Sequence, residues 1–139
     1  MSTAQHPLFR AGLFSGKAAV VSGGGTGLGL QITRELLSLG CDVLICSRSE
    51  QKLSAACAAL EGVARAGGCR VVMRACNVKK EAEVRALFEY AVSELRRVDY
   101  LVNCGGGQFV SPAENISANG ACTAFTPITY PSQRSMPRR

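Results

Sequence analysis

Five glycines within eight residues constrain this chain more than any other feature of its sequence. They fall between Ser22 and Gly29, at Gly23, Gly24, Gly25, Gly27 and Gly29. The apolar run Ala18–Val21 before them predicts a buried parallel strand. After them, apolar residues recur at helical spacing at Leu28, Ile32, Leu36 and Leu39. A strand, a glycine turn and a helix in this order bring backbone N–H groups and a helix N-terminus against a phosphate, and glycine lets the backbone approach closely.

The alternation of strands and helices continues along the chain. The patterns predict strands at Asp42–Ser47, Arg70–Cys76 and Val98–Asn103, and helices from Ser49 to Gly67 and over Lys80–Leu95. We expect an α/β fold with a Rossmann-like parallel sheet, strand order 3-2-1-4 and right-handed crossovers. Two helices would cover one face and the third the other. A ligand is expected where the strand order reverses, between the first and fourth strands.

The predicted apolar faces of the second and third helices define most of the expected core. On the second helix this face consists of Leu53, Cys57, Leu60 and Ala64, and on the third helix of Val84, Leu87, Phe88, Ala91 and Leu95. In the expected strand order 3-2-1-4 the fourth strand is an edge of the sheet, and it is apolar at four of its six positions. We therefore expect the chain to be poorly stable by itself.

Length and composition set the class of protein. The 139 residues suffice for one domain, divided into an irregular lead (1–16), the predicted domain (17–120) and a tail (121–139). The tail holds three of the five prolines and no Asp or Glu, so we expect it to be disordered. A net charge of +6 favours anionic ligands but is not concentrated enough to indicate nucleic acid.

The sequence also bears on redox environment and membranes. Seven cysteines without a Cys-x-x-Cys pair, beside a single histidine, predict reduced thiols rather than a disulfide framework or a zinc site. The chain contains no run long enough for a signal peptide or a membrane span, so we expect no membrane partner and a reducing compartment.

The glycine spacing is Gly23-x-x-x-Gly27-x-Gly29 directly after a strand. It resembles the short-chain dehydrogenase/reductase family, whose turn reads T-G-x-x-x-G-x-G, with Ser22 in the place of the threonine. The alternative is a flexible glycine loop. The resemblance implies a nicotinamide cofactor, contacted at Ser22, Gly23, Gly25, Thr26, Gly27 and Leu28.

The end of the second strand bears on the choice of cofactor. Sites for NAD usually place a carboxylate there for the ribose 2′-hydroxyl, but this strand ends Cys46-Ser47-Arg48. The Arg48 guanidinium and the Ser47 hydroxyl favour the extra phosphate of NADP. Glu50 lies one step into the helix. The alternative is that Arg48 is a solvated surface residue.

Two further strand ends match the family. Asn77-Val78 after the third strand corresponds to the pair that brackets the adenine, although an ordinary turn would also explain it. Asn103-Cys-Gly-Gly106 after the fourth resembles the family motif N-N-A-G, which implies cofactor contacts at Asn103 and Gly105. Cys104 could instead be a nucleophile, but no base adjacent to it in the sequence supports that interpretation.

The run from Leu101 to Ser117 is more specific. Its loop Asn-Cys-Gly-Gly-Gly-Gln-Phe-Val-Ser-Pro-Ala-Glu resembles the peroxisomal trans-2-enoyl-CoA reductases, and the 2,4-dienoyl-CoA reductases are a similar alternative. The resemblance implies NADPH-dependent reduction of the double bond of a trans-2-enoyl-CoA in fatty acyl-CoA chain elongation, as part of peroxisomal fatty acid metabolism. It also implies NADPH and an acyl-CoA as partners, in a homo-oligomer or beside a full-length paralogous subunit.

One departure from the family is large. The family's catalytic Tyr-x-x-x-Lys has no match, because Tyr90, Tyr100 and Tyr130 are followed four residues later by glutamate, cysteine and arginine. We therefore expect a truncated reductase that binds the cofactor without turnover. The alternatives are a working enzyme and a basic interaction tail on an inert domain. The chain ends Met136-Pro-Arg-Arg139, unlike a peroxisomal S-K-L address, so by itself it is expected in the cytoplasm.

Overall fold

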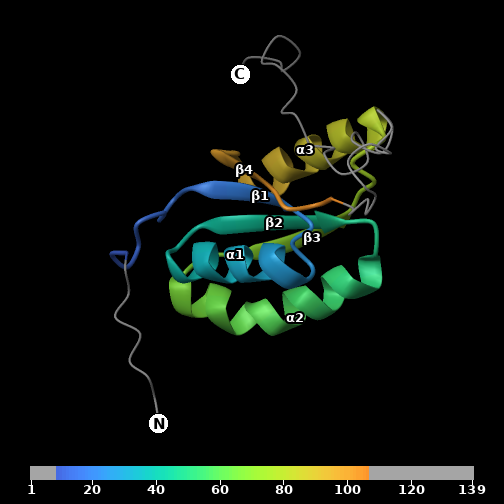
Figure 1. Ribbon diagram of the computed structural model, residues 1–139. Coiled ribbons are helices and arrows are strands. Elements are labelled where there is room, and N and C mark those ends of the chain that lie inside the picture. Colours follow the sequence, from blue (N-terminus) through green and yellow to red (C-terminus); the bar gives the residue numbers. More distant parts are fainter. Residues whose placement is uncertain (1–8, 107–139) are drawn as a thin grey trace, which may run out of the picture.

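A four-stranded parallel sheet forms the centre of the molecule (Figure 1). The computed structural model describes residues 9–106. The strands are β1 (Ala18–Ser22), β2 (Asp42–Ser47), β3 (Val71–Ala75) and β4 (Tyr100–Asn103), in the order β3-β2-β1-β4. Both the parallel pairing and the order agree with the sequence-based prediction. The predicted tail and the loop from residue 107 onward lie outside the described residues.

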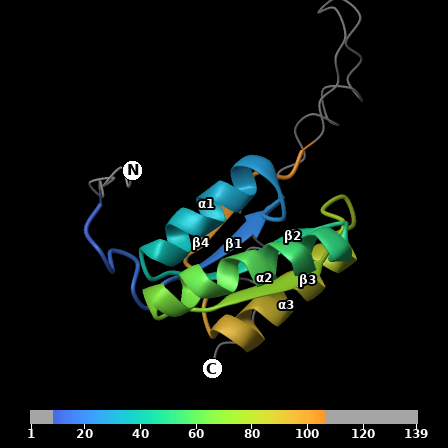
Figure 2. The same cartoon turned by 90° about the horizontal axis from the view of Figure 1, so that it is seen from below.

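Three helices cover the sheet, and they divide as predicted (Figures 1 and 2). Helices α1 (Gly27–Ser38) and α2 (Glu50–Gly67) lie on one face, and α3 (Glu81–Leu95) lies on the other. Gly40 follows α1 with a φ of +88°, in the left-handed region that glycine adopts without strain. Within the described part of the chain, no helix is long and apolar enough to cross a membrane.

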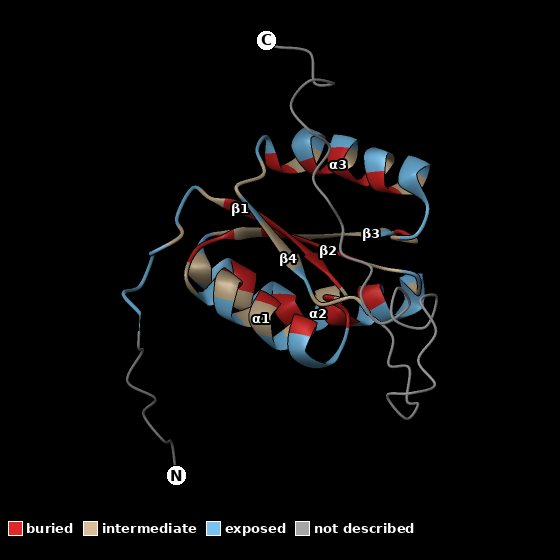
Figure 3. Cartoon of the chain, turned by 45° about the horizontal axis from the view of Figure 1, so that its top comes forward, coloured by how far each residue is buried: buried red, intermediate tan, exposed pale blue. Residues whose placement is uncertain are grey.

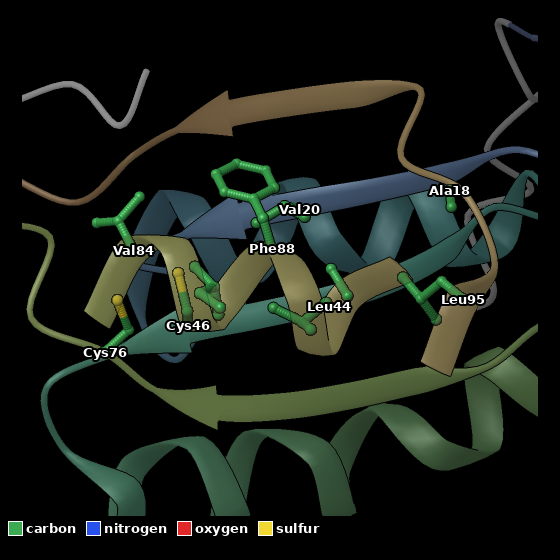
Figure 4. Packing of buried hydrophobic residues seen from close by; sticks show 10 residues of the cluster. Ala18, Val20, Leu44, Cys46, Cys76, Val84, Phe88 and Leu95 are labelled. Carbon is green, nitrogen blue, oxygen red and sulfur yellow. The ribbon is translucent and has the colours of Figure 1, made fainter. Parts of the chain in front are cut away.

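Side chains of the inner strands β1 and β2 alternate between two cores, one on each face of the sheet. Figure 3 shows both strands buried between the helices. Val20 and Leu44 pack with the buried face of α3, and Val21 and Ile45 pack with α1 and α2. This alternation follows from the period of two in a strand. Figure 4 shows the α3 side, where the ring of Phe88 lies beside Val20 of β1. All five residues predicted for the face of α3 are buried.

The buried face of α1 differs from the prediction. Gly29, Thr33 and Leu37 are buried, whereas Leu28 is 80% exposed. The reason is the close approach of α1 to the preceding turn: a Cβ on Gly29 would lie 2.3 Å from the Gly23 carbonyl oxygen. The helix therefore turns its smallest residue inward, while Leu36 packs half-buried against the same core. Cys57 on α2 is only half-buried, because Ala56 occupies the expected position.

The outer strands are also shorter than predicted. β3 lacks Arg70 and Cys76, and β4 begins at Tyr100 rather than Val98. Each pairs on one side only within the described sheet, so fewer backbone groups hold its ends in register. β1 is buried throughout, but both ends of β4 are exposed.

Asp99 holds β4 against β1 at the amino ends of the two strands. Its carboxylate accepts a hydrogen bond from the Ala18 N–H at 2.9 Å, and its own N–H donates to the Ala18 carbonyl at 2.8 Å. Arg97 donates two hydrogen bonds to the same carboxylate, and the Lys17 ammonium lies 3.7 Å away. The Arg97 hydrogen bonds, then the Ala18 N–H and the nearby cations, lower the pKa of Asp99.

Ser22 holds the same two strands together at their carboxyl ends. Its Oγ accepts hydrogen bonds from the N–H groups of Cys104 and Gly105, at 3.2 and 3.1 Å. The Cys104 N–H also donates to the Ser22 carbonyl at 3.1 Å. Ser22 is 1% exposed, so its hydroxyl has little access to water. The hydroxyl that the sequence assigned to cofactor contact therefore also ties the glycine turn to the end of β4.

Replacing Asp99 with Asn should destabilise the chain near neutral pH, because a neutral amide loses the charge-assisted contacts. The Asp99 pKa is lowered on folding, so its stabilisation is complete above its unfolded pKa of about 4 and is lost as pH falls through the folded value. Urea unfolding between pH 3 and 7 should show the wild-type advantage shrinking at the acid end. Glu89→Gln, at an exposed position of α3, is the control; an Asp99→Asn deficit that is independent of pH would contradict the prediction.

Replacing Ser22 with Ala should cost about 1–3 kcal/mol of unfolding free energy, because the N–H groups of Cys104 and Gly105 lose the acceptor that Ser22 Oγ provides. Ser22→Thr keeps the hydroxyl and should lose less. Ser54→Ala, on the exposed side of α2, is the matched control. Chemical denaturation of the three variants checks this, and equal stabilities for Ser22→Ala and Ser54→Ala would show that the hydroxyl does not hold β4.

Candidate functional site

A cavity of about 770 Å³ opens at the carboxyl edge of the sheet. It adjoins the ends of all four strands, including the point between β1 and β4 where the strand order reverses. Crevices at such reversals bind ligands in open α/β sheets. The cavity is lined by Gly23, Gly25, Thr26, Leu28, Gly29, Cys46, Ser47, Arg48, Ser49, Lys52, Cys76, Asn77, Val78, Lys79, Cys104, Gly105 and Gly106.

The glycine turn directs the N-terminus of α1 toward this cavity. Thr26 is the N-cap residue, but its side chain makes no capping hydrogen bond, and the first turn contains no acidic residue. The first N–H groups of a helix lack partners inside it and carry partial positive charge. The start of α1 is therefore suited to an anion that contacts the backbone.

The turn has the shape of a cradle for such an anion. Gly27 has a φ of +56°, and no atom lies within 4 Å of the position where its Cβ would be. Gly23, with a φ of +70°, approaches the end of β4 so closely that a Cβ would lie 2.8 Å from the Gly105 nitrogen. The N–H of Gly23 is held by the Cys46 carbonyl at 2.8 Å. These residues fit a pyrophosphate because open space meets helix N–H groups that have no partner inside the helix.

Three cations line the cavity: Arg48 after β2, Lys52 in the first turn of α2, and Lys79 after β3. All three are exposed, and none takes part in the ion pairs found among residues 9–106. No aspartate or glutamate of the described chain lines the cavity. Glu50 begins α2 beside this wall but lies outside the lining set. The electrostatics therefore favour a polyanionic ligand.

Hydrogen bonds hold the turn after β3 in one shape. The Asn77 N–H donates to Glu83 Oε2 at 2.8 Å, and Asn77 Oδ1 accepts from the Lys79 N–H at 3.1 Å. Lys80 lies 2.9 Å from the same Glu83 carboxylate. The Asn77 N–H and then Lys80 lower the pKa of Glu83. Val78 packs against the α3 core, so the turn that carries Asn77 and Val78 is anchored from both sides.

Thiols also reach the cavity wall, at Cys46, Cys76 and Cys104. Burial raises the pKa of Cys46 to about 12 and raises that of Cys76 as well. A nucleophilic cysteine needs a thiolate. These two positions are therefore structural, and they pack in the α3 core shown in Figure 4.

The structure brings nine of the twelve predicted site residues to the cavity wall. The other three are Ser22, the buried last residue of β1, Gly27 at the start of α1, and Asn103 at the end of β4. Sequence reasoning missed the cations Lys52 and Lys79. For Lys52 a signal was available, since it lies in the first turn after the Ser49 cap and close to Arg48; nothing in the sequence distinguished Lys79 from Lys80.

The chain is similar in sequence to known proteins. The family model described as short chain dehydrogenase matches residues 17–125. Peroxisomal 2,4-dienoyl-CoA reductase of Mus musculus is 33% identical over 82% of this chain and 38% of its own length. The enzyme of the same name from Arabidopsis thaliana is 30% identical over 84% of this chain and 38% of its own. Both relatives carry the name of the alternative that the sequence analysis left beside the enoyl-CoA reductases.

Solved structures show the same arrangement. The citronellol catabolism dehydrogenase AtuB of Pseudomonas aeruginosa PAO1 superposes with a TM-score of 0.71 at 32% identity, over 84% of this chain and 46% of that one. A short chain dehydrogenase from Mycobacterium smegmatis superposes with a TM-score of 0.68 at 31% identity, over 78% and 43%. The chain thus spans less than half the length of these relatives. With its glycine turn, its 3-2-1-4 sheet and these matches, the chain belongs to the short-chain dehydrogenase/reductase family.

Proposed function

We propose that this chain binds NADP(H) and constitutes the cofactor-binding part of a reductase. The observation that carries the proposal is the position of Arg48: it lines the same cavity as the glycine turn, without a carboxylate in the lining set. A dinucleotide held at the start of α1 would extend its adenosine along the ends of β2 and β3. There a 2′-phosphate would contact Arg48. The described residues that line the cavity include no carboxylate to accept a hydrogen bond from the 2′-hydroxyl of NAD.

The chain's own residues would bind and orient the cofactor. The N–H groups at the start of α1 would hold the pyrophosphate, and the anchored turn of Asn77 and Val78 would border the adenine. Ser22 would keep Gly105 beside the glycine turn, as its hydrogen bonds do in the structure. When bound, NADPH supplies a hydride to the substrate.

The substrate class that we propose is an unsaturated acyl-CoA. Two features support it: the names of the relatives, which are 2,4-dienoyl-CoA reductases, and the sequence of the loop after β4, which resembles the enoyl-CoA reductases. Most of that loop lies outside the described residues. The relatives' names also support a peroxisomal setting. We further propose that the chain assembles with copies of itself or with a full-length paralogous subunit.

Replacing Arg48 with Ala should weaken NADPH binding about 10- to 150-fold, which corresponds to a charge-assisted contact of about 1.5–3 kcal/mol. NADH binding should change by less than about twofold, because NADH has no 2′-phosphate for a guanidinium to contact. Fluorescence titration of the full chain with both cofactors measures the effect.

Arg65→Ala is the matched control for Arg48→Ala, since Arg65 lies in the last turn of α2, outside the cavity. It removes the same charge and should leave both affinities unchanged. Equal losses of NADPH and NADH in Arg48→Ala would show that Arg48 does not recognise the 2′-phosphate. Failure of the wild-type chain to bind either cofactor would overturn the proposed function.

The 139-residue chain should bind NADPH without consuming it. The family's proton-donating tyrosine and the lysine that assists it have no match at the required spacing in this sequence. NADPH absorbance with crotonyl-CoA or a 2,4-dienoyl-CoA should therefore decay no faster than without substrate. Decay that depends on the acyl-CoA concentration would establish a working enzyme, and the preferred thioester would then identify the substrate.

A further inference from the structure

We propose that Lys52 is a second residue that recognises the cofactor's 2′-phosphate, acting from α2 together with Arg48 after β2. This inference rests on the proposed NADP(H) site and assigns its specificity to a residue that sequence reasoning did not single out. Lys52 lines the cavity, its side chain is exposed, and it belongs to none of the ion pairs of the described chain.

The backbone of Lys52 is fixed beside the glycine turn. Its N–H donates to Oγ of the helix cap Ser49 at 3.4 Å. A Cβ built on Gly25 would lie 3.7 Å from the Lys52 carbonyl carbon and 3.5 Å from the Leu53 side chain. The first turn of α2 therefore packs directly against the predicted pyrophosphate cradle. A side chain that leaves this turn into the cavity starts between the cradle and the end of β2.

The charge of the ligand calls for more than one cation. A phosphate monoester carries about −1.5 to −2 charges at pH 7, whereas Arg48 supplies one positive charge. The other polar group at this strand end is already engaged, since Ser47 Oγ donates to the Ser49 carbonyl at 3.4 Å. Lysine is a mobile point charge on a long stem, so Lys52 can complete the neutralisation without a fixed fork geometry.

Lys79 provides the contrast because it reaches the cavity from a different wall. Lys79 follows β3, in the turn that Asn77 and Glu83 anchor. Because β2 lies between β3 and β1 in the sheet, Lys79 and the glycine turn lie on opposite sides of the end of β2. We therefore assign the phosphate to the pair on the β2–α2 connection. Lys79 contributes only to the general positive potential of the cavity, which acts on both cofactors.

The test compares Lys52→Gln, Lys52→Arg and Lys79→Gln in the full chain, with NADPH, NADH and 2′,5′-ADP as probes. Lys52→Gln should weaken NADPH and 2′,5′-ADP about tenfold, and NADH less than about twofold. Lys52→Arg should restore most of the affinity. Lys79→Gln should weaken NADPH much less than Lys52→Gln does, because a charge that makes no direct contact is screened by water and salt. Thermal melting identifies any variant that is misfolded, and because capping uses only the Lys52 backbone we expect unchanged melting.

Distinct outcomes separate this inference from the proposed function. If the wild-type chain binds NADPH and Lys52→Gln binds it equally well, Lys52 does not contact the phosphate and the inference fails while the function stands. Equal losses of NADPH and NADH in Lys52→Gln would assign Lys52 to the pyrophosphate and overturn the inference. An NADPH-selective loss of the same size in Lys79→Gln would show a diffuse potential instead of a built contact, which also overturns it.

Discussion

The close contact between the glycine turn and the end of β4 is the constraint on which the rest of the structure depends. A side chain at Gly23 would collide with the backbone of Cys104 and Gly105 at 2.8–2.9 Å. A side chain at Gly29 would collide with the Gly23 carbonyl. Only residues without a Cβ allow α1 to start directly over the sheet edge. That start directs the partial positive charge of the helix into the cavity.

The same contact would couple folding to binding of the proposed cofactor. Asp99 closes the β1–β4 pair at one end and Ser22 closes it at the other. The Ser22 end lies directly beneath the cavity wall that Gly105 forms. A ligand that binds only the folded chain stabilises it by mass action. Because β4 is exposed at both ends of its short ladder, this is where such stabilisation should matter most.

Electrostatics then decide which ligand the cavity favours. The fold places the cations Arg48, Lys52 and Lys79 around the open edge and keeps the carboxylates of the described chain in other roles. Asp99 pairs with β1, Asp42 lies against Arg70, and Glu83 anchors the Asn77 turn. Two of the three thiols at the cavity wall, Cys46 and Cys76, are buried, and their raised pKa values keep them protonated. What remains accessible is positive charge, which suits a phosphorylated nucleotide.

The sequence by itself determined the fold and the family, because these depend on local patterns. The run of apolar residues predicts strand β2, and the helical spacing of apolar residues predicts the buried face of α3. The spacing of the glycines identifies the turn. Tertiary structure decided what depends on contacts between distant segments. These are the inward face of α1, the partners of the Ser22 hydroxyl more than 80 positions away, and the convergence of Lys52 and Lys79 on one cavity. No local period encodes such contacts, since packing between elements fixes them.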